Sequence, residues 1–138
     1  MRSRILFVSG HPDDARRLAP MLQALPLVME HVGTLEQARN QLQQGDYEII
    51  LTEAILPDGD WLSALHLARE HPGEIKVIVT DPQADARFWS EVLNLGAYDL
   101  LTQPFYEPEV RRILYNACTR QPCLTAGAAA GFSRVAST

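Results

Sequence analysis

Short apolar runs alternate with segments of helical period along most of this 138-residue chain. Five of the runs are short and rich in aliphatic side chains, which is typical of strands buried in a sheet. We expect strands at residues 4–9, 27–32, 47–52, 76–80 and 98–101. Between and after these runs, apolar residues recur three and four positions apart, which predicts α-helices with one buried face.

Helix boundary signals accompany the periodic segments. Pro12 suits the first turn of a helix, whereas Pro20 lies inside the same helix and should kink it. Thr34 and Asp60 are favoured N-cap residues, and Gly96 suits the end of a helix. The positions predicted to face inward are Leu18, Met21, Leu22, Leu25, Leu35, Ala38, Leu42, Phe88, Val92, Leu95, Val110, Ile113, Leu114 and Ala117.

Five strand–helix units in succession predict an α/β fold, in which a parallel sheet carries helices on both faces. Right-handed crossovers leave few topologies, and the strand order 2-1-3-4-5 is a common one for five units. That order opens a crevice at the carboxyl ends of the first and third strands. We therefore expect Ser9, Gly10 and His11 to face Glu53 across this crevice.

Composition narrows the class of protein. Hydrophobic residues make up 46% of the chain and charged residues 21%, which is ordinary for a globular protein of one domain. We expect this domain at residues 1–120 and a Gly/Ala-rich tail or linker at 121–138. A net charge of −5 argues against direct binding of nucleic acid or membrane. No apolar run could span a bilayer, so we expect a cytoplasmic protein in which Cys118 and Cys123 stay reduced.

Two stretches at the crevice carry a known pattern. They are IILTEAILPDGD at residues 49–60 and GAYDLLTQPF at residues 96–105. Their order and spacing are similar to those of response-regulator receiver domains, which the chain resembles over residues 4–117. The resemblance implies a (βα)5 fold of the flavodoxin-like, CheY-like kind and a role in two-component signal transduction, a phosphorelay. It also places Glu53 at the phosphoacceptor Asp position and Thr80 at the switch Ser/Thr position.

Three departures from the family pattern concern phosphorylation. Working receivers hold Mg²⁺ with two acidic residues where this chain has Ser9 and Gly10, and they carry a Lys where it has Gln103. Mg²⁺ needs hard oxygen ligands, and phosphoryl transfer depends on neutralising charge by metal and cation. We therefore expect a degenerate receiver, or pseudo-receiver, that is not an enzyme, is not phosphorylated and binds no metal or cofactor. Its role would be protein–protein contact.

Glu53 leaves two interpretations open. Its side chain is one methylene longer than that of Asp, so its carboxylate could imitate a phosphoryl group, hydrogen-bonded to Thr80 or to loop amides and fixing one switch state. Alternatively, it is a solvent-facing carboxylate left after function decayed. The aromatic switch position of the family is Leu100 here, so coupling to an aromatic ring is expected to be absent. Trp61 would cover the crevice or, as we favour, pack as part of its helix.

The fourth predicted helix has more apolar residues than one face needs. If Phe88 and Val92 serve the core, Trp89 and Leu93 point elsewhere, and with Tyr106 they could form an interaction face. The resemblance implies that this region docks a kinase or an output protein, and a homodimer is possible. The alternative is a well-covered core helix with a wide apolar arc.

Two other functions remain open. One is a receiver still phosphorylated by a partner kinase despite its altered pocket. The other is a zinc-dependent deacetylase-like hydrolase, because His11-Pro12-Asp13-Asp14 resembles a motif of those enzymes in which His11 and Asp14 would bind zinc and Asp13 would act as base. The third ligand would then have to come from His31, His66 or His71.

Overall fold

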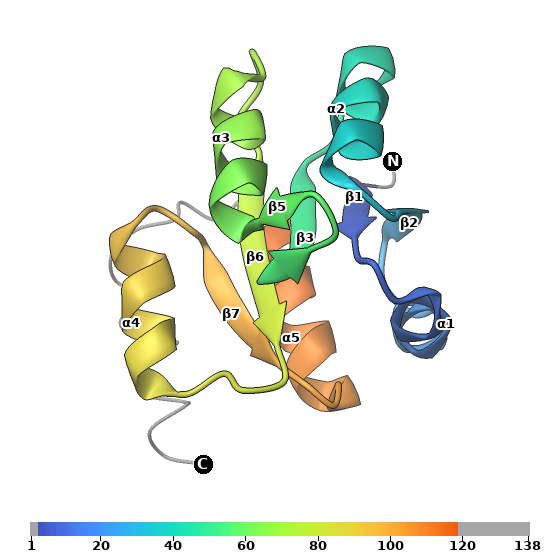
Figure 1. The fold of residues 1–138 in the computed structure, drawn as a ribbon. Coiled ribbons are helices and arrows are strands. Elements are labelled where there is room, and N and C mark those ends of the chain that lie inside the picture. Colours follow the sequence, from blue (N-terminus) through green and yellow to red (C-terminus); the bar gives the residue numbers. More distant parts are fainter. Residues whose placement is uncertain (1–2, 119–138) are drawn as a thin grey trace.

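The computed structural model describes residues 3–118, and the predicted tail at 121–138, with Cys123, lies outside this range. Its main sheet has five parallel strands in the order β2-β1-β3-β6-β7, which confirms the predicted topology (Figure 1). Four of these strands match the predicted runs within a residue or two at each end, and β2 matches its run at both ends. The strands are β1 (Ser3–Val8), β2 (Leu27–Val32), β3 (Ile49–Glu53), β6 (Lys76–Asp81) and β7 (Asp99–Thr102).

Helices cover both faces of the sheet, as expected for crossover connections between parallel strands. One buried cluster lies between the sheet and α1 and α5, and the other lies between the sheet and α2, α3 and α4. The central strands are buried on both sides, which is why their sequences read as unbroken apolar runs. The helices are α1 (Pro12–Met21), α2 (Leu35–Gln44), α3 (Trp61–Glu70), α4 (Ala86–Asn94) and α5 (Glu107–Cys118).

The predicted caps form as hydrogen bonds. The Thr34 hydroxyl accepts from the Gln37 amide at the start of α2, and the Asp60 carboxylate accepts from the Leu62 and Ser63 amides at the start of α3. Gly96 follows α4 with a φ of 115°, a conformation that favours glycine. Its position close to the Arg69 guanidinium also leaves no room for a side chain.

Pro20 was expected to kink α1, and it lies one residue before the helix ends at Met21. Pro20 has no N–H to bond the Arg16 carbonyl, and its ring clashes with that carbonyl, which weakens the last turn.

One helix prediction needs correction. In α4 the buried face was predicted wrongly at one end. Trp89 is buried with Val92, whereas Leu95 is 44% exposed.

A short hairpin was not predicted as strands. It pairs β4 (Ile55–Leu56) with β5 (Gly59–Asp60) around the expected Pro57-Asp58 turn. The Asp58 carboxylate accepts hydrogen bonds from the Leu35 and Glu36 amides, so it helps to cap α2. Through these hydrogen bonds, the hairpin links the end of β3 to the start of α2, which is distant in sequence.

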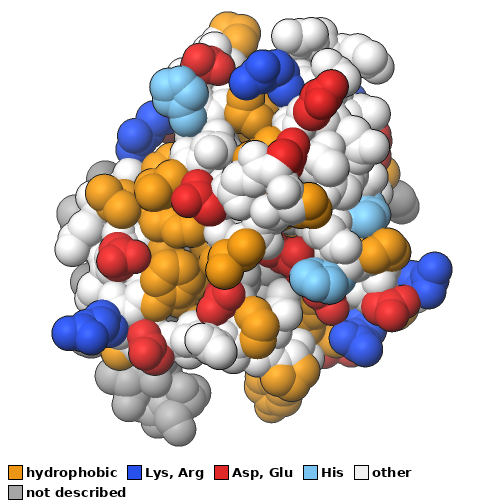
Figure 2. All heavy atoms as spheres, viewed as in Figure 1, with side chains coloured by type: hydrophobic (Ala, Val, Ile, Leu, Met, Phe, Trp, Pro, Cys, Tyr) orange, Lys and Arg blue, Asp and Glu red, His pale blue; other side chains and the backbone are white. Residues whose placement is uncertain are grey.

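The outer surface shows no concentration of one charge on the face seen in Figure 2. Basic side chains stand apart from one another there, with acidic and uncharged side chains between them. Of the helices within residues 3–118, none combines the length and the apolar character needed to cross a membrane.

Candidate functional site

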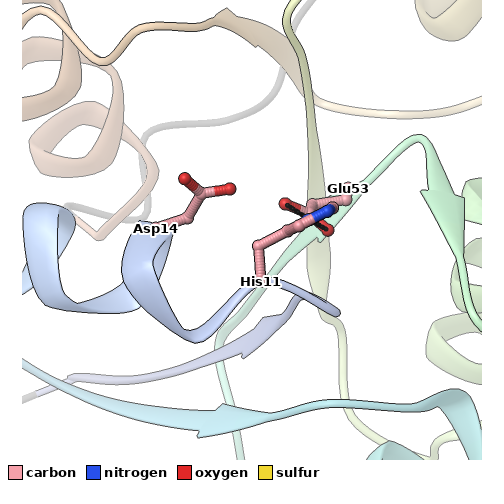
Figure 3. Close-up of side chains that lie close together, drawn as sticks. All are labelled: His11, Asp14 and Glu53. Atoms are coloured by element: carbon pink, nitrogen blue, oxygen red, sulfur yellow. Dashed lines mark hydrogen bonds and ion pairs between the residues drawn. The ribbon is translucent and has the colours of Figure 1, made fainter.

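The candidate site lies where β1 and β3 end, as the strand order predicted. Glu53 is the last residue of β3, and its side chain is 8% exposed. The Gly10 amide donates a hydrogen bond to Glu53 Oε1 at 3.1 Å. His11 Nδ1 lies 3.1 and 3.2 Å from the two carboxylate oxygens, and Figure 3 shows the imidazole directed at the carboxylate. The prediction that Gly10 and His11 face Glu53 is therefore confirmed.

Asp14 also reaches the site; it was paired with His11 in the hydrolase alternative but was not predicted to lie beside Glu53. It lies in the first turn of α1, and single ligating atoms of His11, Asp14 and Glu53 all lie within 4.8 Å of one another (Figure 3). The Asp14 carboxylate forms an ion pair with Arg17 at 3.2 Å as well. An acidic residue in the first turn also suits the helix dipole, so the sequence by itself gives no sign that Asp14 approaches Glu53.

The electrostatics of the site favour bound protons. Burial raises the pKa of Glu53, and the nearby Asp14 raises it further, although His11 opposes both effects. The hydrogen bond to Glu53 raises the pKa of His11. The Glu53 carboxylate and the His11 imidazole therefore hold a proton more readily than the same groups would in water.

The two positions that carry acids in working receivers offer no charge. Ser9 is fully buried, and its hydroxyl is engaged by the His11 backbone, accepting from the amide at 3.0 Å and donating to the carbonyl at 3.2 Å. A Cβ at Gly10 would lie only 3.0 Å from the Pro57 ring. The loop is thus packed around small residues, and a larger side chain at Gly10 would have to displace the proline.

Thr80 and Gln103 complete the pocket wall. Thr80 is fully buried on β6, where it is the register partner of Glu53. Its hydroxyl and the Gln103 Nε2 are buried atoms without a hydrogen-bond partner within the described part of the chain. Two kinds of hydrogen-bond partner were predicted for Glu53, Thr80 and the loop amides. The structure has a hydrogen bond from the Gly10 loop amide and none from Thr80. The alternative of a solvent-facing Glu53 is wrong, because the side chain is buried.

The predicted interaction face is only partly exposed. Trp89 was expected to point away from the core, but it is buried and its indole Nε1 donates to Asp99 Oδ1 at 3.0 Å. That expectation was wrong because α4 turns Trp89 toward the sheet. Leu93 is half-buried against the core, and Tyr106 is 65% exposed.

The structure agrees with the predictions for Trp61 and for Leu100, the position where the family often has an aromatic residue. Trp61 packs inside the core at the start of α3, with its ring edge-on to Phe88, as favoured over covering the crevice. Leu100 is buried in β7, so no aromatic ring occupies the family's switch position.

The motif of the zinc hydrolase assembles only in part. His11 and Asp14 lie together, but Asp13, the predicted base, pairs with Arg16 at 2.8 Å and its side chain is 70% exposed. His31 Nε2 is engaged by the Ser9 carbonyl oxygen at 2.9 Å. Within residues 3–118, no second histidine completes the predicted set of ligands.

A five-stranded parallel sheet in the order β2-β1-β3-β6-β7, with a carboxylate at the end of β3, defines the class of doubly wound α/β domains of the flavodoxin-like, CheY-like kind. A family model described as "Response regulator receiver domain" matches residues 5–115. The chain therefore belongs to the response regulator receiver domain family and is a receiver domain of two-component signalling, with the CheY-like fold that its sequence predicted.

Known relatives agree with this assignment. The chain is 35% identical over 95 residues to the "Probable transcriptional regulatory protein y4xI" of Sinorhizobium fredii, a match that covers 67% of this chain and 42% of that protein. The chain spans less than half the length of the curated relatives it matches.

Solved structures share the fold. A signal receiver domain of an HD domain-containing protein from Pseudomonas fluorescens superposes with a TM-score of 0.76 at 23% identity, covering 86% of this chain and 96% of that one. The beryllofluoride-activated NtrC4 receiver domain dimer superposes with a TM-score of 0.71 at 22% identity, covering 84% and 93%.

Proposed function

We propose that this receiver domain signals through contact with protein partners and is not phosphorylated, with Glu53 standing in place of the phosphoacceptor Asp. The observation that carries the proposal is the composition of the pocket around Glu53. Ser9, Gly10 and Gln103 occupy the positions where working receivers carry two acids and a Lys. Phosphoryl transfer needs its charge neutralised by a metal and a cation, and these three residues supply neither.

The contacts of Glu53 support the same proposal. Its carboxylate accepts from the Gly10 amide and lies against His11 Nδ1, so the groups that would stabilise an incoming phosphoryl group are already engaged. A γ-carboxylate acceptor would also place a phosphoryl group about one C–C bond further into the pocket than an aspartate does. Both features oppose acyl phosphate formation at this position.

Glu53 is proposed to hold the β1–α1 loop in one state. The carboxylate is tied to Gly10 and His11 in that loop, whereas the Thr80 hydroxyl makes no hydrogen bond within residues 3–118. Glu53 thus imitates a phosphoryl group only toward the loop and not toward the switch position. Unchanged affinity of a partner for the Glu53→Gln variant would remove this part of the proposal.

The partners are proposed to be a kinase or an output protein, and the location cytoplasmic. The surface of α4, β7 and α5 remains the proposed contact face, now with Tyr106 and Leu93 and without the buried Trp89. NtrC4, a structural neighbour, forms a receiver domain dimer. A homodimer of this chain through the same face stays a prediction, which sedimentation analysis of the wild type and of Tyr106→Ala tests.

Intact-mass measurement tests the absence of phosphorylation. The chain is incubated with acetyl phosphate and Mg²⁺ beside a receiver that retains the acidic pair, the phosphoacceptor Asp and the Lys. The control receiver should gain the mass of one phosphoryl group, whereas this chain should keep its original mass. An added phosphoryl group on this chain would instead favour the alternative of a phosphorylatable regulator.

A further inference from the structure

Three side chains that commonly bind metals converge at the end of β3. They are the exposed imidazole of His11, the half-buried carboxylate of Asp14 and the buried carboxylate of Glu53. They come from the β1–α1 loop, the first turn of α1 and the last residue of β3, and Figure 3 shows all three directed into the same space. This set differs from the acidic pair of working receivers, because Ser9 and Gly10 contribute no ligand.

A second observation shows that the pocket suits a hydrated guest. The fully buried Thr80 hydroxyl and the Gln103 Nε2 have no hydrogen-bond partner within residues 3–118, and both residues line the same cavity as the three side chains. Unsatisfied buried polar groups are costly, so each favours a partner inside the cavity. The cavity volume of about 430 Å³ leaves room for an ion with several waters, since one water takes up about 30 Å³.

The chemistry of the donors selects the kind of ion. An imidazole nitrogen suits zinc and neighbouring transition metals, whereas Mg²⁺ prefers oxygen ligands in an octahedron. Three protein ligands with remaining positions for water are typical of open zinc sites. We propose that His11, Asp14 and Glu53 form a binding site for a borderline divalent cation of the Zn²⁺ type, whose bound waters reach Thr80 and Gln103.

The geometry needs only a small adjustment. Ligands bound to one zinc ion at about 2.0–2.2 Å lie about 3–3.5 Å apart, and His11 Nδ1 is already 3.1 Å from Glu53. Asp14 would have to move toward the other two. Its competing partner, Arg17, has a side chain that is 69% exposed, and surface ion pairs of this kind contribute little stability.

This inference goes beyond the proposed function, because binding a cation here does not depend on whether Glu53 can be phosphorylated. An ion at this position would tie the start of α1 to the end of β3. Occupancy by the cation would then stabilise the folded chain, by an amount that rises with the logarithm of the cation concentration once this exceeds the Kd. The receiver would have an input other than a phosphoryl group.

Isothermal titration calorimetry with Zn²⁺ alone tests the site. The full chain is used with Cys118→Ser and Cys123→Ser, so that thiolates add no binding. We expect one bound Zn²⁺ per chain, a higher melting temperature with Zn²⁺ and much weaker binding of Mg²⁺. Each of the substitutions His11→Ala, Asp14→Asn and Glu53→Gln should weaken Zn²⁺ binding at least about tenfold.

The chain offers a matched control in His66. Its side chain is 73% exposed, as is that of His11, and its Nε2 lies 3.1 Å from the Glu70 carboxylate. Among residues 3–118, no second carboxylate lies within ligand distance of it. His66→Ala should therefore bind Zn²⁺ like the parent chain. Because His11 is exposed, His11→Ala should also fold normally, and its unfolding curve checks this.

Three results would overturn the proposal. They are the absence of Zn²⁺ binding, Zn²⁺ binding that survives in the His11→Ala variant, and Mg²⁺ binding as tight as that of Zn²⁺. Failure here leaves the proposed signalling function untouched, because the test with acetyl phosphate is read separately by mass. An added phosphoryl group in that test would likewise leave the zinc titration to be judged by itself.

Discussion

Trp89 shows what one buried polar contact contributes to the fold. Its indole donates to Asp99 Oδ1 at 3.0 Å, and the same oxygen accepts from the Leu100 amide at 2.8 Å. Both side chains are buried, so this network joins α4 to β7 inside the core. The residue that sequence reasoning assigned to a contact surface is instead part of the interior.

The Trp89→Phe substitution should therefore destabilise the protein. It removes the indole N–H and leaves the Asp99 oxygen with one donor fewer, which costs about 1–3 kcal/mol of the free energy of unfolding. Urea denaturation measures this difference. Asp99→Asn keeps an acceptor oxygen and should cost less, whereas a Trp89→Phe variant as stable as the wild type would contradict the assigned role.

The pairing of Glu53 with His11 can be tested by titration. The hydrogen bond from Glu53 raises the pKa of His11, because it favours the protonated imidazole. In the Glu53→Gln variant the pKa of His11 should therefore fall toward its ordinary value, as followed by NMR of the imidazole protons across pH. Glu70→Gln, which alters the partner of His66, should leave the titration of His11 unchanged. An unaltered His11 titration in Glu53→Gln would show that the pair does not form.

Single residues also show which parts of the site and the core could be predicted from the sequence and which could not. Glu53 could be placed because a strand end in a parallel sheet has a known position, and the Gly10 and His11 contacts follow from that topology. Asp14 was paired with His11 through the hydrolase motif, but its approach to Glu53 could not be predicted, because it depends on the side-chain rotamer and on the angle of α1.

Trp89 was misplaced because the buried face was assigned to Phe88, Val92 and Leu95. The apolar residues of α4 instead form one arc that includes Trp89.

Among the helices and strands, the β4–β5 hairpin has the least expected structural role. Its turn residue Asp58 accepts from the Leu35 amide at 2.9 Å and the Glu36 amide at 3.2 Å, so a loop next to the site supports α2. Thr34, the residue directly before α2, caps the same helix through the Gln37 amide. The periodicity of α2 predicted the helix, but it held no information on a capping partner 23 residues away.

Asp58→Ala should destabilise the protein by about 1 kcal/mol, the usual effect of losing an N-terminal cap. Backbone hydrogen bonds, first that of Leu35, lower the pKa of Asp58 in the folded state. The stabilisation is therefore complete above the pKa of the unfolded state, about 4, and is lost as the pH falls through the lower folded value.

Thermal unfolding of the wild type and of Asp58→Ala across pH measures this effect. The difference in stability should be largest near neutral pH and should shrink below about pH 4. Asp58→Asn, which keeps one acceptor oxygen, should lie between the two proteins at neutral pH. A gap between wild type and Asp58→Ala that persists unchanged in acid would show that the carboxylate does not act as a cap.

For the molecule as a whole, the alternation of strands and helices was sufficient to predict the architecture. Parallel strands need crossovers, and right-handed crossovers with five units led to the observed order. The order in turn placed Ser9, Gly10 and Glu53 at one edge of the sheet. The internal chemistry of this end of the sheet could not be predicted. The approach of Asp14 to Glu53, and the lack of a hydrogen-bond partner for Thr80 and Gln103 within residues 3–118, depend on packing.

The chain therefore keeps one property of receivers, their architecture, without the residues for the other, their phosphoryl chemistry. The chain keeps the sheet, the five helices and the position of a carboxylate after β3. It lacks the pair of acids and the Lys that would bring Mg²⁺ and a phosphoryl group together. On this basis we expect the architecture to serve recognition by partners while the pocket no longer responds to phosphate donors.

The most direct test is an NMR titration of the ¹⁵N-labelled chain with Mg²⁺ and beryllofluoride, the reagent that activates the NtrC4 receiver domain. A pocket without the acidic pair and the Lys should not bind this complex, so the amide signals of Gly10, Glu53 and Thr80 should stay in place. Saturable shifts of these three signals, seen only when both reagents are present, would contradict the central claim that the pocket has lost phosphoryl chemistry.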